Sequence, residues 1–293
     1  MNFIVFDLEW NTATPGKNQV AGYRRKLFAE ITEIGACRLD QRGNHLDELF
    51  LTVKPKIFKH LNPYIANVTR QNMTELKELG EPFPEAIRQF MAWISGPAVF
   101  CSWSDSDFKP LQENLEFYEI VAPLPNRCID VQYLFHRLVD QGHRQRSLVH
   151  AVDFFSIAKE RSFHNAVDDA YYTGRVLEKL LEVAETKDIN LETLLHKFSW
   201  NPNLEYSHKE SLPFERSPKA IPAKLSGQAV ICPACRRELI PKGQIGWKKK
   251  KKHYVATAIC PEHGQVTGRV SYGRLNGVVP ELHFSYWLKK YDQ

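Results

Sequence analysis

The sequence has no apolar run that approaches the roughly 18 residues needed to span a bilayer. Asp7 already stands among the first eight residues, so the basic stretch and apolar stretch of a secretory signal do not occur there. No internal repeat is visible. We therefore expect a cytoplasmic protein that does not interact with membranes.

The chain also has few cysteines, and their spacing does not suggest a disulfide framework. Cys37, Cys101 and Cys128 are isolated on expected strands, where a buried thiol behaves as a small hydrophobic side chain. The other three cysteines cluster after residue 230 and call for a separate explanation.

The 293 residues suggest one large domain or two, and 43% hydrophobic residues suffice for a packed core. The net charge of +5 is unevenly distributed. Residues 226–293 hold 12 Lys and Arg against 4 Asp and Glu, a net charge of +8, which leaves −3 for residues 1–225. A compact basic module favours a polyanionic partner.

The most informative stretch is FIVFDLEW, residues 3–10. It predicts a buried strand that ends in two acids, Asp7 and Glu9, which point to the same side because side chains alternate along a strand. Two carboxylates held together repel each other, and a divalent cation would remove that cost. A strand that ends in two solvated acids is the simpler alternative.

Further strands are expected at residues 31–39 and 46–53, followed by strands that alternate with helices. This order predicts an α/β fold in which helices flank a mixed sheet. Asn165 is the expected cap of a long helix that runs to about residue 185. We expect a catalytic domain over 1–185, a mostly irregular linker over 186–225 with one short helix, and a small β-rich module over 226–293.

Two more acidic sites lie where expected elements meet. Asp107 follows an apolar strand and opens a helix, and HNAVDDA contains His164 and Asp169. If Asn165 caps the helix, His164 lies in the preceding loop. Each acid has a simpler explanation as a cap or a surface residue, and the neighbours Asp105 and Asp168 are alternatives.

Taken together, these residues predict a two-metal site, because such a site needs several carboxylates from different elements and a group that activates water. Asp7, Glu9, Asp107 and Asp169 are the expected ligands of Mg²⁺ or Mn²⁺, which prefer oxygen. His164 is the expected base, since its ordinary pKa lies near neutrality.

The same residues, in this order, resemble the DEDDh (DnaQ-like) 3′→5′ exonucleases of the ribonuclease H-like fold. The resemblance covers about residues 1–185 and is closest to the KapD-like, small-RNA-degrading branch, in which a Trp often precedes the second motif, as Trp103 does here. It implies two Mg²⁺ ions, release of 5′-mononucleotides from a free 3′ end, and His164 as general base.

The chain departs from the family after the first motif, where many relatives carry small residues or Thr and this chain has Trp10 and Asn11. Trp10 either stacks on the last base of the substrate or belongs to the core. The motif VTR at Val68 stands where relatives often have Leu-Thr-Gly.

The late cysteines form two knuckles, Cys232-Pro-Ala-Cys235 and Cys260-Pro-Glu-His263. A CxxC followed by a CxxH predicts one structural Zn²⁺ in a tetrahedral site, with free thiols as the alternative. A module this small has little core, so the metal would supply much of its folding free energy. His253 and His283 are weaker candidates for the fourth ligand.

Between the knuckles, five lysines with aromatic neighbours predict a loop that contacts phosphates and bases. The residues are Trp247, Lys248, Lys249, Lys250, Lys251, Lys252 and Tyr254. A solvated hairpin tip is the alternative.

These features favour a two-metal 3′→5′ exonuclease that hydrolyses single-stranded nucleic acid with a free 3′ end and grips it with a zinc ribbon. RNA is slightly favoured over DNA, although no residue is identified that reads a 2′-hydroxyl. Alternatives are a DNA repair or proofreading exonuclease, a non-catalytic nucleic-acid-binding adaptor, and a scaffold that binds a protein through the ribbon.

Overall fold

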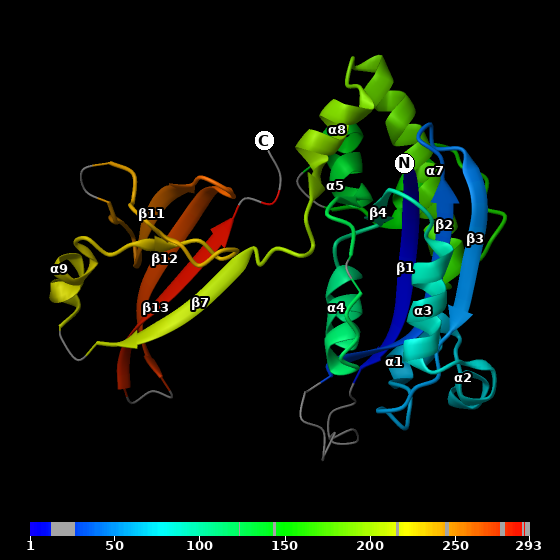
Figure 1. Ribbon diagram of the computed structural model, residues 1–293, viewed down its shortest axis with the longest axis horizontal. Helices are drawn as coiled ribbons and strands as arrows, with labels where there is room; N and C mark the ends of the chain where they lie inside the picture. Colours follow the sequence, from blue (N-terminus) through cyan, green and yellow to red (C-terminus); the bar gives the residue numbers. More distant parts are fainter. Residues whose placement is uncertain are drawn as a thin grey trace. The chain divides into compact units, whose positions relative to one another are not determined.

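The computed structural model describes residues 1–12, 27–122, 124–142, 145–214, 217–243, 246–275, 279–288 and 290 (Figure 1). The chain divides into two compact units, Met1–Pro202 and Asn203–Gln293. In the described ranges, no helix combines the length and the apolar character that crossing a membrane requires.

The first unit is built on a mixed six-stranded sheet with strand order β3-β2-β1-β4-β5-β6. The strands are β1 Asn2–Thr12, β2 Ala29–Leu39, β3 His45–Thr52, β4 Ala98–Ser102, β5 Cys128–Asp130 and β6 Ser199–Trp200. The first three strands pair as an antiparallel meander, whereas β4 runs parallel to β1 and β5 parallel to β4. The predicted α/β fold with a mixed sheet is confirmed.

Helices cover both faces of this sheet (Figure 1). They are α1 Pro63–Thr69, α2 Met73–Leu79, α3 Phe83–Trp93, α4 Phe108–Phe117, α5 Val131–Phe135, the π-helix η1 His136–Asp140, α6 Leu148–Phe154, α7 Ala166–Thr186 and α8 Leu191–Phe198.

The alternation of side chains along β1 divides its residues between the two faces. Phe3 and Val5 belong to a core shared with α5, α6 and α7, whereas the ring of Phe6 contacts Phe90 of α3 and Phe108 of α4 on the other face. Asp7 continues the odd-numbered series, so it is directed to the α7 face.

Gly35 of β2 determines how closely α7 approaches the sheet. A Cβ at this position would lie 2.0 Å from the backbone carbon of Ala166, so only glycine permits the contact. The first turn of α7 therefore rests directly on β2, beside the residue that pairs with Asp7.

The second unit holds a five-stranded antiparallel sheet with order β10-β11-β12-β13-β7 and a two-stranded sheet of β8 and β9. Its elements are β7 Ser207–Pro213, the 3₁₀ helix η2 Pro218–Ala220, α9 Ile221–Leu225, β8 Val230–Ile231, β9 Glu238–Leu239, β10 Lys248–Lys250, β11 His253–Cys260, β12 Gly264–Leu275 and β13 Val279–Leu288. Phe284, Tyr286 and Val270 lie in its core.

The irregular linker expected over 186–225 is corrected by the structure. The expected short helix is present as α8, and its buried Leu194, Leu195 and Phe198 join the core of the first unit. The following strand β7 pairs with β13 in the second unit. The sequence of β7 is polar and does not predict a strand, because β7 lies at the edge of the sheet and its residues alternate only between exposed and half-buried.

Candidate functional sites

Three carboxylates from two elements meet on the α7 face of the first sheet. Asp7 and Glu9 come from β1 and Asp169 from α7, and one oxygen of each lies within 4.8 Å of the others. Asp7 and Glu9 therefore share a side, as the alternation predicts. The close approach of α7 at Gly35 places Asp169 beside them.

Asp107 lies against the same strand, immediately before α4. Its carboxylate oxygen Oδ1 accepts a hydrogen bond from the backbone N–H of Leu8 at 3.3 Å, and the residue is buried. The neighbouring Asp105 is exposed. Asp107 thus contacts the strand that carries Asp7 and Glu9.

His164 lies in the loop before α7, as predicted from Asn165, whose side chain accepts a hydrogen bond from the N–H of Asp168 and caps the helix. The backbone of His164 is left-handed, with φ +68°. Its N–H donates to Oδ2 of Asp169 at 3.1 Å. Asp168 instead faces Arg161 at 3.7 Å, so Asp169 is the acid that joins the cluster.

Sequence reasoning missed a fifth acid, Glu33 of β2. It pairs directly with Glu9 across the antiparallel strands, is only 8% exposed, and accepts a hydrogen bond from the N–H of Ala166 at 3.4 Å. The sequence did contain a signal, because Glu33 is a charged residue within β2. Almost every residue of that strand is buried, and a charged side chain is seldom buried without a partner.

Burial and mutual repulsion raise the pKa of each carboxyl in the cluster. Burial is the main cause for Asp7, whose pKa lies well above its usual value, with Asp107 and then Asp169 adding to it. Burial, together with Glu33, raises the pKa of Glu9 to about 8. Burial also raises the pKa of Asp107 to about 7 and that of Asp169 to about 6.

The donor set fits a divalent cation. Among the described residues, Oδ1 of Asp169 is buried and has no hydrogen-bond partner, so one acceptor of the cluster is left unsatisfied. Carboxylate oxygens are the ligands that Mg²⁺ and Mn²⁺ prefer. A cation bound here would stabilise the ionised form of these carboxyls, which burial destabilises.

The backbone next to this cluster is irregular. The register of β1 and β2 shifts between Glu9 and Trp10, and Trp10 is half-buried. Asn11 is fully buried, donates to the carbonyl of His60 at 2.9 Å and accepts from the N–H of Asn62 at 2.8 Å. Asn11 thus holds the start of α1 against β1.

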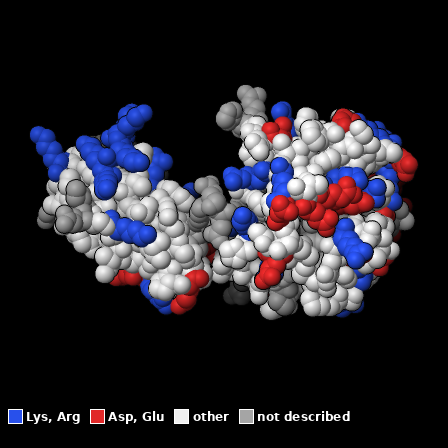
Figure 2. All heavy atoms as spheres, turned by 90° about the horizontal axis from the view of Figure 1, so that it is seen from above, with Lys and Arg blue, Asp and Glu red and all other residues white. Residues whose placement is uncertain are grey.

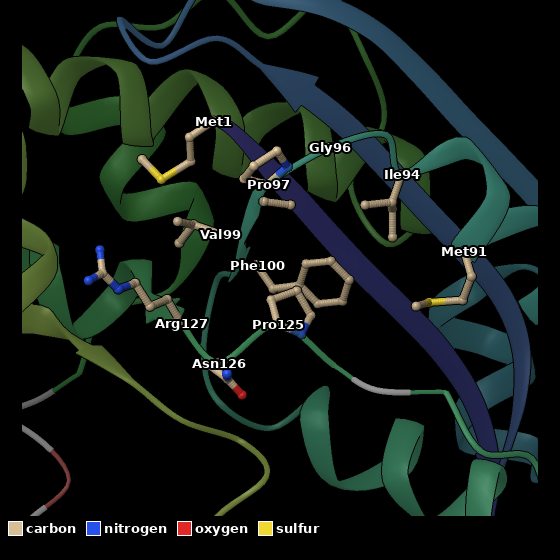
Figure 3. A pocket seen from close by; sticks show the side chains of 11 residues that line it. Met1, Met91, Ile94, Gly96, Pro97, Val99, Phe100, Pro125, Asn126 and Arg127 are labelled. Atoms are coloured by element: carbon tan, nitrogen blue, oxygen red, sulfur yellow. The ribbon is translucent and has the colours of Figure 1, made fainter.

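A cavity of about 500 Å³ lies at the other end of β1 (Figure 3). Met1, Val99, Phe100 and Arg127 are among its lining residues. Asp7 stands six positions after Met1, which corresponds to about 20 Å along an extended strand. The cavity is therefore separate from the acidic cluster.

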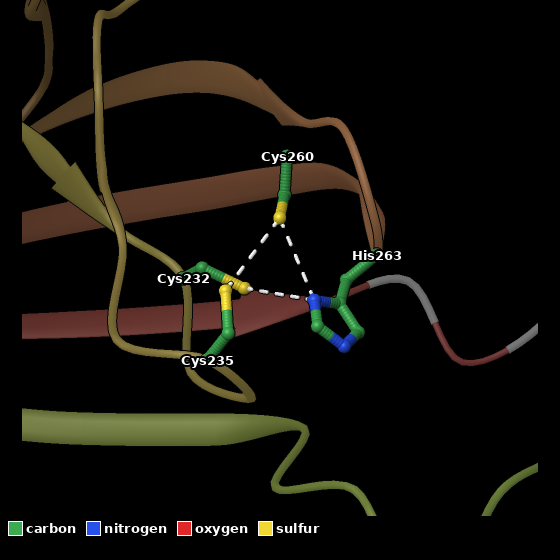
Figure 4. A group of neighbouring side chains, drawn as sticks. All are labelled: Cys232, Cys235, Cys260 and His263. Carbon is green, nitrogen blue, oxygen red and sulfur yellow. Dashed lines mark hydrogen bonds between the residues drawn. The ribbon is translucent and has the colours of Figure 1, made fainter.

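In the second unit, Cys232, Cys235, Cys260 and His263 converge, with donor atoms within 4.8 Å of one another (Figure 4). The Sγ atoms of Cys235 and Cys260 are 3.7 Å apart, and Nδ1 of His263 lies 3.7 Å from Cys232 Sγ and 3.5 Å from Cys260 Sγ. His253 and His283 lie outside the group. No disulfide links any of the six cysteines, all of which the structure describes.

These separations match the edges of a zinc tetrahedron. Zn–S and Zn–N bonds of about 2.3 and 2.0–2.1 Å give edges of about 3.8 Å between sulfurs and about 3.6 Å between sulfur and nitrogen. Burial acts to raise the pKa of the Cys260 thiol, but hydrogen bonds with His263 and from backbone N–H groups outweigh it and lower that pKa to about 7. The donor set fits Zn²⁺.

The lysine stretch forms β10 and the turn that follows it. Lys248, Lys249, Lys250, Lys251 and Lys252 are all exposed. Tyr254 is half-buried and packs against the core of the unit. In Figure 2, Lys and Arg side chains gather on the second unit, whereas acidic side chains form a band on the first.

The expectation that Trp247 contacts nucleic acid is wrong. The side chain is only 6% exposed, packs against Gly268 and Phe284, and donates its indole N–H to the carbonyl of Gln228 at 2.8 Å. Its amphipathic ring is used inside the core because the absence of a side chain at Gly268 leaves room for it.

Comparisons with known proteins identify the first unit. Residues 4–177 match the exonuclease family described as RNase_T. Curated proteins give no match. Similar solved structures include cell-death related nuclease 4 (CRN-4), at 16% identity over 62% of this chain and 64% of that chain, with a TM-score of 0.51.

Two others are the nuclease domain of 3′hExo, a DEDDh family member, bound to rAMP, and the zinc-bound E. coli ExoI–ssDNA complex. The first is 14% identical over 62% of this chain and 92% of that chain, with a TM-score of 0.52. The second is 14% identical over 92% of this chain and 54% of that chain, with a TM-score of 0.53. The chain spans less than two thirds of CRN-4 and of E. coli ExoI, and these identities establish the fold alone. Since the family match covers more than half of the chain, including the four predicted ligands Asp7, Glu9, Asp107 and Asp169 and the predicted base His164, the chain belongs to the RNase_T exonuclease family.

Proposed function

We propose that the chain is a two-metal 3′→5′ exonuclease that releases 5′-mononucleotides from single-stranded nucleic acid, with RNA the favoured substrate. The observation that carries this proposal is that half-buried Asp7, Glu9 and Asp169 meet in one acidic cluster, and that buried Asp107 accepts a hydrogen bond from the N–H of Leu8 on the same strand. The intact ligand set and Trp103 favour the KapD-like, small-RNA-degrading branch.

Asp7, Glu9, Asp107 and Asp169 would hold two Mg²⁺ or Mn²⁺ ions. When bound, such ions stabilise the charge that develops on the attacking and leaving oxygens of the phosphodiester. The raised pKa of each carboxyl supports this assignment, because ionisation of the cluster at neutral pH calls for added positive charge.

His164 acts as the general base and takes the proton of the attacking water on its imidazole. Two observations support this role. His164 lies in the loop before α7, so its imidazole stands outside the helix. The N–H of His164 donates a hydrogen bond to Asp169, which holds the proposed base beside a proposed ligand. Half-buried Trp10, one residue after Glu9, stacks on the terminal base.

The second unit is a structural zinc ribbon that binds the substrate. Cys232, Cys235, Cys260 and His263 hold the zinc, as the tetrahedral separations support. The exposed lysines 248–252 contact phosphates, and Tyr254 supports the turn beside them. We propose these roles for 203–293, and a catalytic role for 1–202.

The experiment that tests the proposal is degradation of 5′-labelled single-stranded RNA and DNA with Mg²⁺ or Mn²⁺. We expect mononucleotide release and a ladder that shortens from the 3′ end, lost in His164→Ala and blocked by a 3′-phosphate. RNA should be degraded faster than DNA. Tight binding without degradation would instead identify a non-catalytic adaptor.

A further inference from the structure

The five-stranded sheet of the second unit has one buried face and one open face. On β13, Leu282, Phe284, Tyr286 and Leu288 are buried, whereas the alternate residues His283, Ser285 and Trp287 are half-buried or exposed. β11 follows the same alternation, with Ala256, Ala258 and Cys260 buried. The residues between them face away from the core.

Trp287 lies within this open face and is 39% exposed. Its neighbours across the strands are small hydroxyl residues, Thr267 on β12 and Ser207 on β7. Cross-strand neighbours share a face, so no large side chain stands beside the indole in its own row. One side of the ring is therefore available to a ligand.

Two residues further along each strand, away from the row that contains Trp287, lies a second row of cross-strand neighbours, and this row is basic. It runs through Lys248, Val255, Arg269, Ser285 and Lys209, so exposed cations stand on three of its five strands. The next row adds exposed Lys250 from β10.

None of these cations is neutralised. Within the described part of the chain, Lys209, Lys248, Lys250 and Arg269 form no ion pair. Glu281, the acid among the open-face residues of β13, is buried, and its carboxylate lies 3.9 Å from Nδ1 of His283. The three rows from Trp287 to Lys250 thus carry exposed cations on β7, β10 and β12 and no carboxylate.

We propose that this open face is a platform for single-stranded nucleic acid, with Trp287 as the residue on which a base stacks and Arg269 and Lys209 as phosphate contacts. An exposed indole beside uncompensated cations and hydroxyls matches the chemistry of an unpaired base with its phosphates. Duplexes fit less well because their bases are already stacked. The platform rests on the proposed function, and it extends substrate contact from the lysine turn to the sheet.

The test uses the full chain carrying Asp7→Asn, which prevents cleavage, and a fluorescently labelled 20-nucleotide single strand titrated at several salt concentrations. Trp287→Ala should weaken binding roughly 5- to 100-fold, whereas Trp287→Phe should keep most of the affinity. Arg269→Gln with Lys209→Gln should reduce the slope of log K against log salt by about 1.4, since each phosphate contact contributes about 0.7.

Lys224→Gln is the matched control, because this exposed lysine lies on α9 and outside the sheet; it should leave the binding constant unchanged. Zinc content and melting temperature report whether each variant is folded. Unchanged affinity in folded Trp287→Ala, or an unchanged salt slope in the double variant, would overturn the platform. Turnover is measured separately in the chain with Asp7 intact, so absence of exonuclease activity with Trp287-dependent binding would reject only the proposed function.

Discussion

Glu33 on β2 lies directly opposite Glu9 on β1, and the two glutamates are the only acidic cross-strand pair among the described residues of these two strands. Like charges in this position repel each other. Glu33 also accepts the N–H of Ala166, at the start of the helix that carries Asp169. One buried carboxylate therefore connects the two strands of the acidic cluster with its helix.

Replacing Glu33 with glutamine should stabilise the metal-free protein. Gln keeps an oxygen that can accept the hydrogen bond from the N–H of Ala166. It removes the charge of Glu33, which is the second cause, next to burial itself, of the raised pKa of Glu9. We expect a higher melting temperature for Glu33→Gln at pH 8 without divalent metal, and a smaller gain with saturating Mn²⁺. An unchanged melting temperature in the absence of metal would show that the two carboxyls are not coupled.

The stability of the metal-free protein should fall as pH rises from about 4.5 to about 8. Unfolded Glu9 ionises near its ordinary pKa of 4.5, whereas the folded residue holds its proton to about pH 8. The folded state therefore binds more protons in this window, which makes stability highest at its acidic end. The slope is about 1.4 kcal/mol per pH unit for each extra proton.

Thermal unfolding between pH 4.5 and 8, with and without Mn²⁺, measures this dependence. Added Mn²⁺ should raise the melting temperature most at pH 8, where ionised carboxyls bind it best. Stability that rises with pH in metal-free protein would contradict the expected direction.

Two pairs of adjacent acids allow matched tests of the ligand assignment. Asp107→Asn and Asp169→Asn should abolish cleavage and weaken the metal-dependent gain in melting temperature, because Asp169 belongs to the acidic cluster and Asp107 contacts β1, the strand of that cluster. Their neighbours serve as controls. Asp105→Asn changes an exposed residue, and Asp168→Asn a residue that faces Arg161, so both should retain most activity. Equal loss in either control would reassign the ligand.

His164→Gly should separate catalysis from folding. His164 has a φ of +68°, which glycine adopts without a steric penalty, and glycine keeps the N–H that donates to Asp169. Loss of the imidazole should reduce kcat by about 10²- to 10⁴-fold, as expected for a general base. The melting temperature should stay within a few degrees. Full activity in this variant would remove His164 from the reaction.

Local patterns predicted much of the fold and of the acidic cluster. Alternation along β1 put Asp7 and Glu9 on one side, and the cap at Asn165 put His164 outside α7. Both depend on neighbours in sequence, so the chain alone carries the information. The sequence left Asp168 as an alternative to Asp169, and the structure separates the two through the contact of Asp168 with Arg161.

Long-range packing was not predictable in the same way. Glu33 joins the cluster because β2 pairs with β1 in one register, and a shift by one residue would turn it to the other face. Trp247 is buried because Gly268, on another strand, leaves space for its ring. Polar β7 becomes a strand only through pairing with β13. None of these partners is near in sequence.

The zinc assignment predicts one tightly bound Zn²⁺ per chain, lost in Cys260→Ser. Cys260 Sγ lies 3.7 Å from Cys235 Sγ and 3.5 Å from His263 Nδ1, so its loss removes one corner of the tetrahedron. Cys128→Ser is the matched control, because Cys128 is buried in β5 of the first unit and is not one of the four donors. Metal analysis of purified protein should give about one zinc for the unmodified chain and for Cys128→Ser.

Because metal binding supplies folding free energy to so small a module, a chelator should unfold the second unit before the first. This unfolding should be seen as early proteolysis after residue 202. Zinc retained in Cys260→Ser, or a second unit that resists proteolysis after chelation, would contradict a structural metal site.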